Sequence, residues 1–245
     1  MVDNSSALGD PSGPLTVSGG TLDLDGNSLT VGSLSGGPDG AITDTAAGYR
    51  TATLTVAQAG DTSFGGAIED GRNGQTPALV MDGAGTLVLT GANTYTGGTG
   101  IDGGTLELAD SGALGYGGLT IDDGGTLDLW GATQAISSLT LANGSVGGGS
   151  ITADGSLELE SGTISANLGG WGALTKSGSG TVILSGTDAC TGGTQIEAGT
   201  LQVDGGLAGA KRAKVILRAG WAGGRTTQGI VHRWRGERVV VRSAA

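Results

Sequence analysis

A short glycine-led motif recurs along most of this chain and constrains its fold more than any other feature. The pattern Gly-[Thr/Ser]-[Leu/Val]-x-[Leu/Val] occurs seven times, as GTLDL at 20–24, GTLVL at 85–89, GTLEL at 104–108, GTLDL at 125–129, GSLEL at 155–159, GTVIL at 180–184 and GTLQV at 199–203. Alternating aliphatic residues with a polar residue between them are typical of a short β-strand with one apolar face. The preceding glycine supplies a turn. The chain is therefore predicted to be all-β, built from many short strands.

The spacing of the motif indicates how these strands are stacked. Successive copies start 65, 19, 21, 30, 25 and 19 residues apart, and the first gap is about three times 22, so we expect degenerate copies inside it. A period near 20 residues that returns the same strand in the same phase favours a right-handed parallel β-helix. About nine coils are expected in residues 15–206, in a rod of roughly 45 Å. An antiparallel β-sandwich is the alternative.

The composition allows only a thin core. Glycine supplies 53 of the 245 residues and aromatic residues only 3%, so layers of Leu, Val and Ile must fill the interior. The single cysteine, Cys190, excludes an intramolecular disulfide framework. No apolar run is long enough for a transmembrane helix. The first residues, MVDNSSALGDPSG, lack the basic and apolar regions of a signal peptide.

Charge divides the chain into two regions. Residues 1–208 contain three cations (Arg50, Arg72 and Lys176) against 22 acids, a balance of −19, whereas residues 209–245 contain nine cations and one acid, a balance of +8. We therefore expect an N-terminal segment at 1–14, a body of repeats at 15–208 and a basic tail of foreign composition at 209–245. The acidic body argues against charge-driven binding of nucleic acid or anionic membrane.

Two longer segments repeat the same order of residues. They are GAGTLVLTGANTYTGGTGIDGGTLEL at 83–108 and GSGTVILSGTDACTGGTQIEAGTLQV at 178–203, and they lie 95 residues apart. Both segments resemble the autotransporter-associated β-strand repeat, and a weaker resemblance extends over residues 15–206. Generic glycine-rich sequence would not reproduce this order twice, so the chain is identified as an autotransporter passenger.

The resemblance implies a pectin-lyase-like β-helix that is exported and displayed at the cell surface or outside the cell. It also implies a β-barrel translocator as partner; we expect that barrel and the signal peptide to lie outside this chain, which has no suitable run of strands. The second segment departs from the first, because Asp188 and Cys190 replace Asn93 and Tyr95. This exchange weakens any claim that the Asn or the aromatic ring is required.

No catalytic, cofactor-binding or metal-binding residue is predicted. Residues 1–208 contain no histidine, which excludes a Ser-His-Asp triad or a His-ligated zinc site there. His232 stands alone in the basic tail and is expected to be non-catalytic. Cys190 has no base near it in sequence and is expected to pack inside a turn. The Gly-Gly pairs at 97–98 and 192–193 are expected in turns between coils, since no lysine follows to make a phosphate loop.

Four aspartates beside predicted strands are the strongest candidates for chemistry: Asp102, Asp122, Asp123 and Asp128. Two converging carboxylates can make an acid/base pair or a calcium site. However, a polysaccharide lyase needs cations to stabilise a carbanion, and cations are scarce in the body. The acids also fall at outward positions of alternating strands, where ordinary solvation explains them. The chain is therefore expected not to be an enzyme.

These features predict a structural and adhesive surface stalk without catalysis of its own. A host surface or a glycan is the expected partner, contacted by outward Thr and Asn ladders. Trp130 and Trp171 are expected to pack or to cap coils, with stacking on a sugar as the other interpretation. One alternative function is a polysaccharide lyase or hydrolase on the same β-helix. Another is a basic tail that binds nucleic acid or lipopolysaccharide.

The repeat pattern stops after Leu207. KVILR at 214–218 and RVVVRS at 238–243 have strand-like composition but are expected to lack the phase of the coils. One interpretation is a cap whose positive charge docks on the acidic body. We favour the hypothesis that the reading frame shifts near residue 208. Renewed coils in another frame of the downstream DNA would support it.

Overall fold

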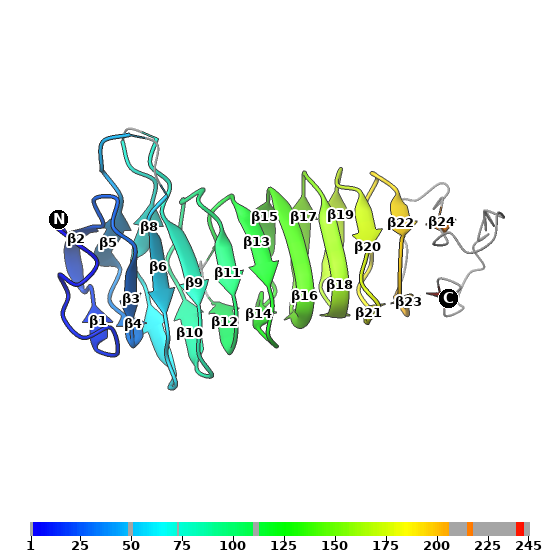
Figure 1. Ribbon diagram of the computed structural model, residues 1–245, viewed down its shortest axis with the longest axis horizontal. Helices are drawn as coiled ribbons and strands as arrows, with labels where there is room; N and C mark the ends of the chain where they lie inside the picture. Colours follow the sequence, from blue (N-terminus) through cyan, green and yellow to red (C-terminus); the bar gives the residue numbers. More distant parts are fainter. Residues whose placement is uncertain are drawn as a thin grey trace.

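The chain folds into an elongated rod of stacked coils (Figure 1). The computed structural model describes residues 2–48, 51–72, 74–109 and 113–205, together with the backbones of two short strands at 215–217 and 239–242. Within these residues all regular structure is β-strand, which confirms the all-β class. No helix in this part of the chain offers a span that could cross a lipid bilayer.

Each coil has three sides, and each side stacks on the same side of the next coil by parallel pairing. We number the sides in chain order as faces 1, 2 and 3. The strands of face 1 are β3 (Leu29–Val31), β6 (Thr53–Val56), β9 (Ala78–Met81), β11 (Thr99–Ile101), β13 (Gly118–Ile121), the first part of β16 (Ser138–Gly147), the first part of β18 (Leu157–Ile164), β20 (Leu174–Lys176) and β22 (Thr194–Ile196).

The remaining strands form the other two faces. Face 2 contains β1 (Pro14–Thr16), β4 (Ser33–Ser35), β7 (Thr62–Phe64), β10 (Thr86–Leu89), β12 (Thr105–Leu108), β14 (Thr126–Asp128), the second parts of β16 and β18, β21 (Thr181–Leu184) and β23 (Thr200–Val203). Face 3 contains β2 (Gly19–Asp23), β5 (Asp39–Thr43), β8 (Ala67–Glu69), β15 (Thr133–Ile136), β17 (Ser150–Ala153) and β19 (Asn167–Gly170).

The register of face 1 sets the length of each coil. Paired residues on neighbouring coils lie between 17 positions apart, as for Leu157 and Leu174, and 25 apart, as for Leu54 and Leu79. Nine strands stack on this face between residues 29 and 196. The parallel β-solenoid of about nine coils is thus confirmed, and the antiparallel sandwich is wrong because the ladders of the described body are parallel.

The core is a set of aliphatic columns that run along the rod axis. On face 2, Leu87, Leu106 and Leu127 lie in register, and each is 0% exposed. The residues between them on each strand point outward, as the alternation of the motif predicts. Full burial of one such leucine contributes about 1.5–3 kcal/mol. A chain with so few aromatic residues is stable in this fold because each coil needs only a thin filling.

The phase of the glycine-led motif differs from the prediction at two of its seven copies. Five copies lie on face 2, but the copy at 20–24 lies on face 3 in β2, and the copy at 155–159 lies on face 1 in β18. All three faces need the same alternation of inward and outward side chains. The motif therefore predicts a strand but does not predict which face contains it. In the 65-residue gap, β4 and β7 hold the face 2 positions with sequences that lack the motif.

Two strands run around the corner between faces 1 and 2. β16 pairs with β18 from Leu139 to Val146, with register shifts on both sides of Ala142, where the sheet bends. Asn143 at this bend has φ 155°. These two strands link faces 1 and 2 into one sheet in the middle of the rod.

The predicted basic tail lies mostly outside the described residues. β24 (Val215–Leu217) pairs in parallel with β22, and β25 (Val239–Arg242) pairs antiparallel with β23. β24 therefore continues the column of face 1, so the expectation that the tail strands lack the phase of the coils is wrong for this strand. The boundary at residue 208 and the frameshift stay predictions.

Candidate binding surface

The fold places two of the four predicted aspartates in a ladder at the corner between faces 1 and 2. Asp82, Asp102 and Asp122 each follow a strand of face 1 directly, on three successive coils. Their backbone amides donate to Val56 O, Met81 O and Ile101 O of the preceding coils at 2.9, 2.8 and 3.0 Å. Sequence reasoning missed Asp82, which the coil register would have revealed. Asp128 lies apart from the ladder, on face 2 opposite Glu107.

Electrostatic repulsion acts along this ladder. Partial burial raises the pKa of Asp102, and the neighbouring carboxylates of Asp82, Asp122 and Asp123 raise it further. The backbone of Asp123 is in the left-handed region, with φ 46°, and its amide donates to Asp122 Oδ1 at 2.8 Å. Among the described residues, no group of three or more His, Cys, Asp or Glu side chains has the arrangement of a metal site.

Several polar side chains point into the rod on face 3, within or next to coils that have no regular strand there. Asn93 Oδ1 accepts from Ile68 N at 2.9 Å, and its Nδ2 donates to Gly91 O at 3.2 Å and Ala113 O at 2.6 Å. Gln134 similarly holds both backbone groups of Leu114, at 2.9 Å to the amide and 3.1 Å to the carbonyl. These amides replace the backbone hydrogen bonds that a missing strand leaves unmade.

Asp188 occupies the position equivalent to Asn93 without an equivalent set of bonds. It is 5% exposed, and neither carboxylate oxygen has a hydrogen-bond partner at normal distance. Burial raises the pKa of Asp188 to about 7, although the backbone of Leu168 opposes the rise. An isolated carboxylate inside a low-dielectric core favours the protonated form.

Cys190 packs partly against the core, as the sequence predicts. Burial and the carboxylate of Asp188 raise the pKa of its thiol to about 11. The thiol is therefore protonated at neutral pH and is a poor nucleophile. His232 and Arg50 lie outside the described residues, so the expected non-catalytic role of His232 stays a prediction.

The two Gly-Gly pairs form the turns that lead onto face 1, as predicted. A Cβ atom at Gly97 would lie 2.4 Å from Thr76 O, and one at Gly192 would lie 2.4 Å from Trp171 O. Each following glycine, Gly98 or Gly193, has a positive φ, of 99° or 90°. The pairs are needed because the backbones of neighbouring coils approach closely at this corner.

Lys176 is buried inside the rod, in the column of face 1 that contains aliphatic residues in other coils. It is 0% exposed. Its Nζ donates to the carbonyls of Ser177, Gly178 and Ala198, the last two at 2.9 and 3.2 Å. Desolvation lowers the pKa of the ammonium group, and Glu160 acts in the opposite direction. Lys176 therefore tethers a turn and is not presented to solvent.

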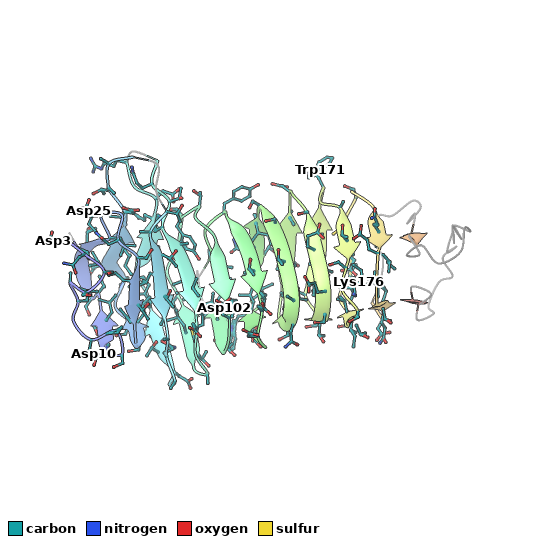
Figure 2. The ribbon with its side chains drawn as sticks, viewed as in Figure 1. Asp3, Asp10, Asp25, Asp102, Trp171 and Lys176 are labelled. Atoms are coloured by element: carbon teal, nitrogen blue, oxygen red, sulfur yellow. The ribbon has the colours of Figure 1, made fainter. Side chains whose placement is uncertain are left out.

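Among the described residues, three large aromatic side chains lie on the outside of the rod. Trp171 is 78% exposed, Trp130 66% and Tyr116 47%. Figure 2 shows Trp171 projecting from the edge of the rod. The expected packing role is therefore wrong for both tryptophans, because so little of either side chain is covered. Tyr116 was missed by sequence reasoning; its hydroxyl donates to Asp154 Oδ2 at 2.8 Å across two coils.

The three aromatic residues flank one sheet. β15, β17 and β19 pair in parallel on face 3. Trp130 lies at the corner through which the chain enters this sheet from face 2. Tyr116 and Trp171 lie at the opposite corner, between face 3 and face 1. The outward side chains of the sheet are small, and we call this surface the floor. The aromatic rings at its edges are larger and project further from the rod.

Comparison with known proteins identifies the repeat. Residues 79–108 and 174–203 match the model of the passenger-associated-transport-repeat family. Both segments are therefore similar to passenger repeats. They correspond to the two segments on which the predicted resemblance to autotransporter passengers was based, 95 residues apart in equivalent positions of the solenoid.

A curated relative supports the same conclusion over a longer stretch. The chain is 37% identical over 137 residues, 54% of its length, to the adhesin BmaC autotransporter of Brucella suis biovar 1 (strain 1330). It spans about 4% of the length of that relative. No solved structure matches the chain. The resemblance to autotransporter passengers is confirmed, and with it the predicted place among exported, cell-surface proteins.

Proposed function

We propose that this solenoid is an adhesive surface stalk that binds its partner through its sides and carries out no catalysis. The observation that carries the proposal is the pair of passenger repeats within a continuous solenoid, supported by the stretch that is similar to an autotransporter adhesin. A host surface is the proposed partner. The outward side chains on the faces of the rod are not part of its thin aliphatic core. They can therefore contact a partner without disturbing the packing of the coils.

The placement of the acids supports the non-catalytic part of the proposal. Asp102 and Asp122 repel each other along one corner, and Asp128 lies on another face. Lys176, one of three cations in residues 1–208, is buried and bound to carbonyl oxygens. A lyase needs a cation beside a general base that a substrate can reach; Glu160 lies near Lys176, but the ammonium group is buried and is not open to a substrate.

Adhesion is tested with the 245-residue chain immobilised on beads and presented to cultured epithelial monolayers. Beads should bind in proportion to surface density, and soluble chain should compete. Beads coated with an unrelated protein of equal charge are the control. Binding equal to that control would refute the adhesive role.

The absence of catalysis is tested separately. The chain is incubated with acidic and neutral polysaccharides, and unsaturated and reducing ends are measured. We expect no turnover. Turnover that disappears when Asp102, Asp122, Asp123 and Asp128 are all replaced by alanine would instead establish a polysaccharide lyase or hydrolase.

A further inference from the structure

The sheet of β15, β17 and β19 on face 3 has the features of a ligand-binding surface, and its rim is the first of them. Large exposed aromatic side chains are rare in this chain, whose aromatic content is 3%. Within the part of the chain that the structure describes, the three exposed by 47% or more, Tyr116, Trp130 and Trp171, all border this one sheet. Exposed apolar groups gathered around one patch indicate a binding surface.

The backbone at Trp130 gives independent evidence for a role outside folding. Trp130 has φ 47°, a left-handed conformation that bulky side chains rarely adopt. Its amide donates to Asp128 Oδ1 at 2.9 Å, which helps to hold the turn. The indole is 66% exposed, so packing does not compensate for the strain. A strained residue without a packing reason points to function.

The floor of the sheet is flat, small and polar. Thr133, Ser150 and Asn167 lie side by side in one outward file, and Ala135, Thr152 and Gly169 lie in the other. Asn167 Nδ2 donates to Ser150 Oγ at 3.3 Å. Neighbouring coils lie about 4.8 Å apart, and a four-residue strand is about 13 Å long. The patch therefore has the size for a short oligosaccharide.

The chemistry of the patch selects the class of ligand. The apolar C–H face of a pyranose packs on an aromatic ring, while its hydroxyls bond to hydroxyl, amide and carboxylate groups. Two carboxylates lie at this rim: Asp154 accepts from the Tyr116 hydroxyl at 2.8 Å, and Asp128 accepts from the Trp130 amide at 2.9 Å. The surrounding residues 1–208 have a balance of −19. Negative potential disfavours sialylated or sulfated glycans, so a neutral saccharide fits.

We propose that the outer surface of β15, β17 and β19, bordered by Tyr116, Trp130 and Trp171, binds neutral oligosaccharides. The proposal rests on the adhesive function proposed above and names the chemistry of its partner. Trp130 on one side and Trp171 with Tyr116 on the other act as platforms for sugar rings. Asn167, Ser150 and Thr152 provide hydrogen bonds between them.

The test measures binding of the full chain to chitotetraose, cellotetraose, maltotetraose and a lactosamine tetrasaccharide, and to sialylated and sulfated forms of the last, by calorimetry and tryptophan fluorescence. At least one should bind, with a change in fluorescence. Trp171→Ala and Trp130→Asn should each weaken this binding at least tenfold. Asn tolerates the left-handed backbone at 130, so the second variant keeps the fold. Binding of none of these saccharides, or binding of sialylated and sulfated glycans alone, would overturn the proposal.

A second pair of variants separates loss of the surface from loss of the fold. A Cβ at Gly169 would lie 3.8 Å from Ile151 O, an ordinary contact, so Gly169→Met raises a side chain above the floor without disturbing the coil. Gly60→Met is the matched control, because a Cβ there meets nothing within 4 Å and the residue lies at the corner between faces 1 and 2. Only Gly169→Met should abolish binding; equal behaviour of the two variants would sink the proposal.

The bead assay distinguishes this proposal from the adhesive function on which it rests. If beads bearing Trp171→Ala adhere as well as the parent while saccharide binding is lost, the sugar site exists but another surface carries adhesion. If the parent binds no saccharide and yet adheres, the sugar proposal is wrong and the adhesive function stands. If the parent does neither, both proposals fail.

Discussion

Asp188 occupies the same inward position in the second passenger repeat that Asn93 occupies in the first, 95 residues earlier. Asn93 forms three hydrogen bonds to backbone groups of its own and neighbouring coils. The oxygens of Asp188 have no partner at normal distance. Replacing the amide with a carboxyl group thus removes the hydrogen bonds to the backbone and places a titratable group inside the rod.

Asp188→Asn should stabilise the coil at alkaline pH. The folded pKa of Asp188, about 7, lies above its ordinary value of 3.8. The stability that its protonated form contributes is therefore full below pH 3.8 and lost as pH rises through about 7. The loss is on the order of 4 kcal/mol at pH 8, since one pKa unit corresponds to about 1.4 kcal/mol.

Hydrogen exchange of residues 181–203 at pH 5 and pH 8 measures this effect. The parent should exchange faster at pH 8 after correction for intrinsic rates, and Asp188→Asn should remove the difference. Asn93→Asp is the matched control and should create the same pH dependence in the first repeat. A parent chain with identical protection at both values of pH would contradict the assignment.

Lys176→Met should keep or raise stability, whereas Lys176→Ala should lower it by about 2–5 kcal/mol through a cavity. Met81 fills the equivalent position in the first repeat and is 0% exposed, so the site accepts a thioether of similar length. Removing the buried ammonium group also removes its desolvation cost. Urea unfolding of both variants and of the parent checks the order; a methionine variant clearly less stable than the parent would show that the tether to Gly178 and Ala198 dominates.

Gly97→Ala and Gly192→Ala should each destabilise the solenoid by about 1–3 kcal/mol, because the added carbon overlaps a carbonyl oxygen of the neighbouring coil. Those contacts are 2.4 Å in both cases. Gly60→Ala should leave stability unchanged, since nothing lies within 4 Å of its Cβ position. Thermal unfolding of the three variants side by side is the measurement. Similar effects at all three positions would refute the close approach of coils at this corner.

Deletion of residues 90–184 should yield a shorter solenoid that still folds. Leu89 and Leu184 end equivalent strands of face 2, β10 and β21, and five strands of face 1 lie between them. The rod should shorten by about 24 Å, five coils at 4.8 Å each. X-ray scattering measures the length and circular dichroism the strand content. Deletion of 90–189, which breaks the register, should aggregate or unfold; equal folding of both deletions would argue against a strict coil register.

The strands were predictable because alternation of aliphatic and polar residues has the same meaning in every coil. The face to which each strand belongs could not be predicted in this way. GSLEL at 155–159 differs little from GTLEL at 104–108, yet the first contributes to face 1 and the second to face 2. Only the hydrogen-bond register between coils separates them, and that register depends on loop lengths that vary from coil to coil.

The candidate surface was only partly predictable. Trp130 and Trp171 were singled out from the sequence, but their exposure depends on the corners at which they lie. The partnership of Tyr116 with Asp154 spans 38 residues and two coils, and no local pattern connects the two. Lys176 shows another limit: a lysine is almost never fully buried, yet this one is, because the alternation of its strand turns position 176 inward.

The hydrogen bonds of all three faces run along the rod axis, because the strands lie across it. Tension applied to the two ends of the rod therefore acts on those bonds directly, and each coil is held only by its neighbours. Under flow, a cell attached through such a stalk would release coils one after another from an end. With 17 to 25 residues in a coil, each step lengthens the tether by roughly 60–85 Å. The solenoid would then lengthen in steps, and these steps would lower the peak force on the proposed contact between its side and a partner.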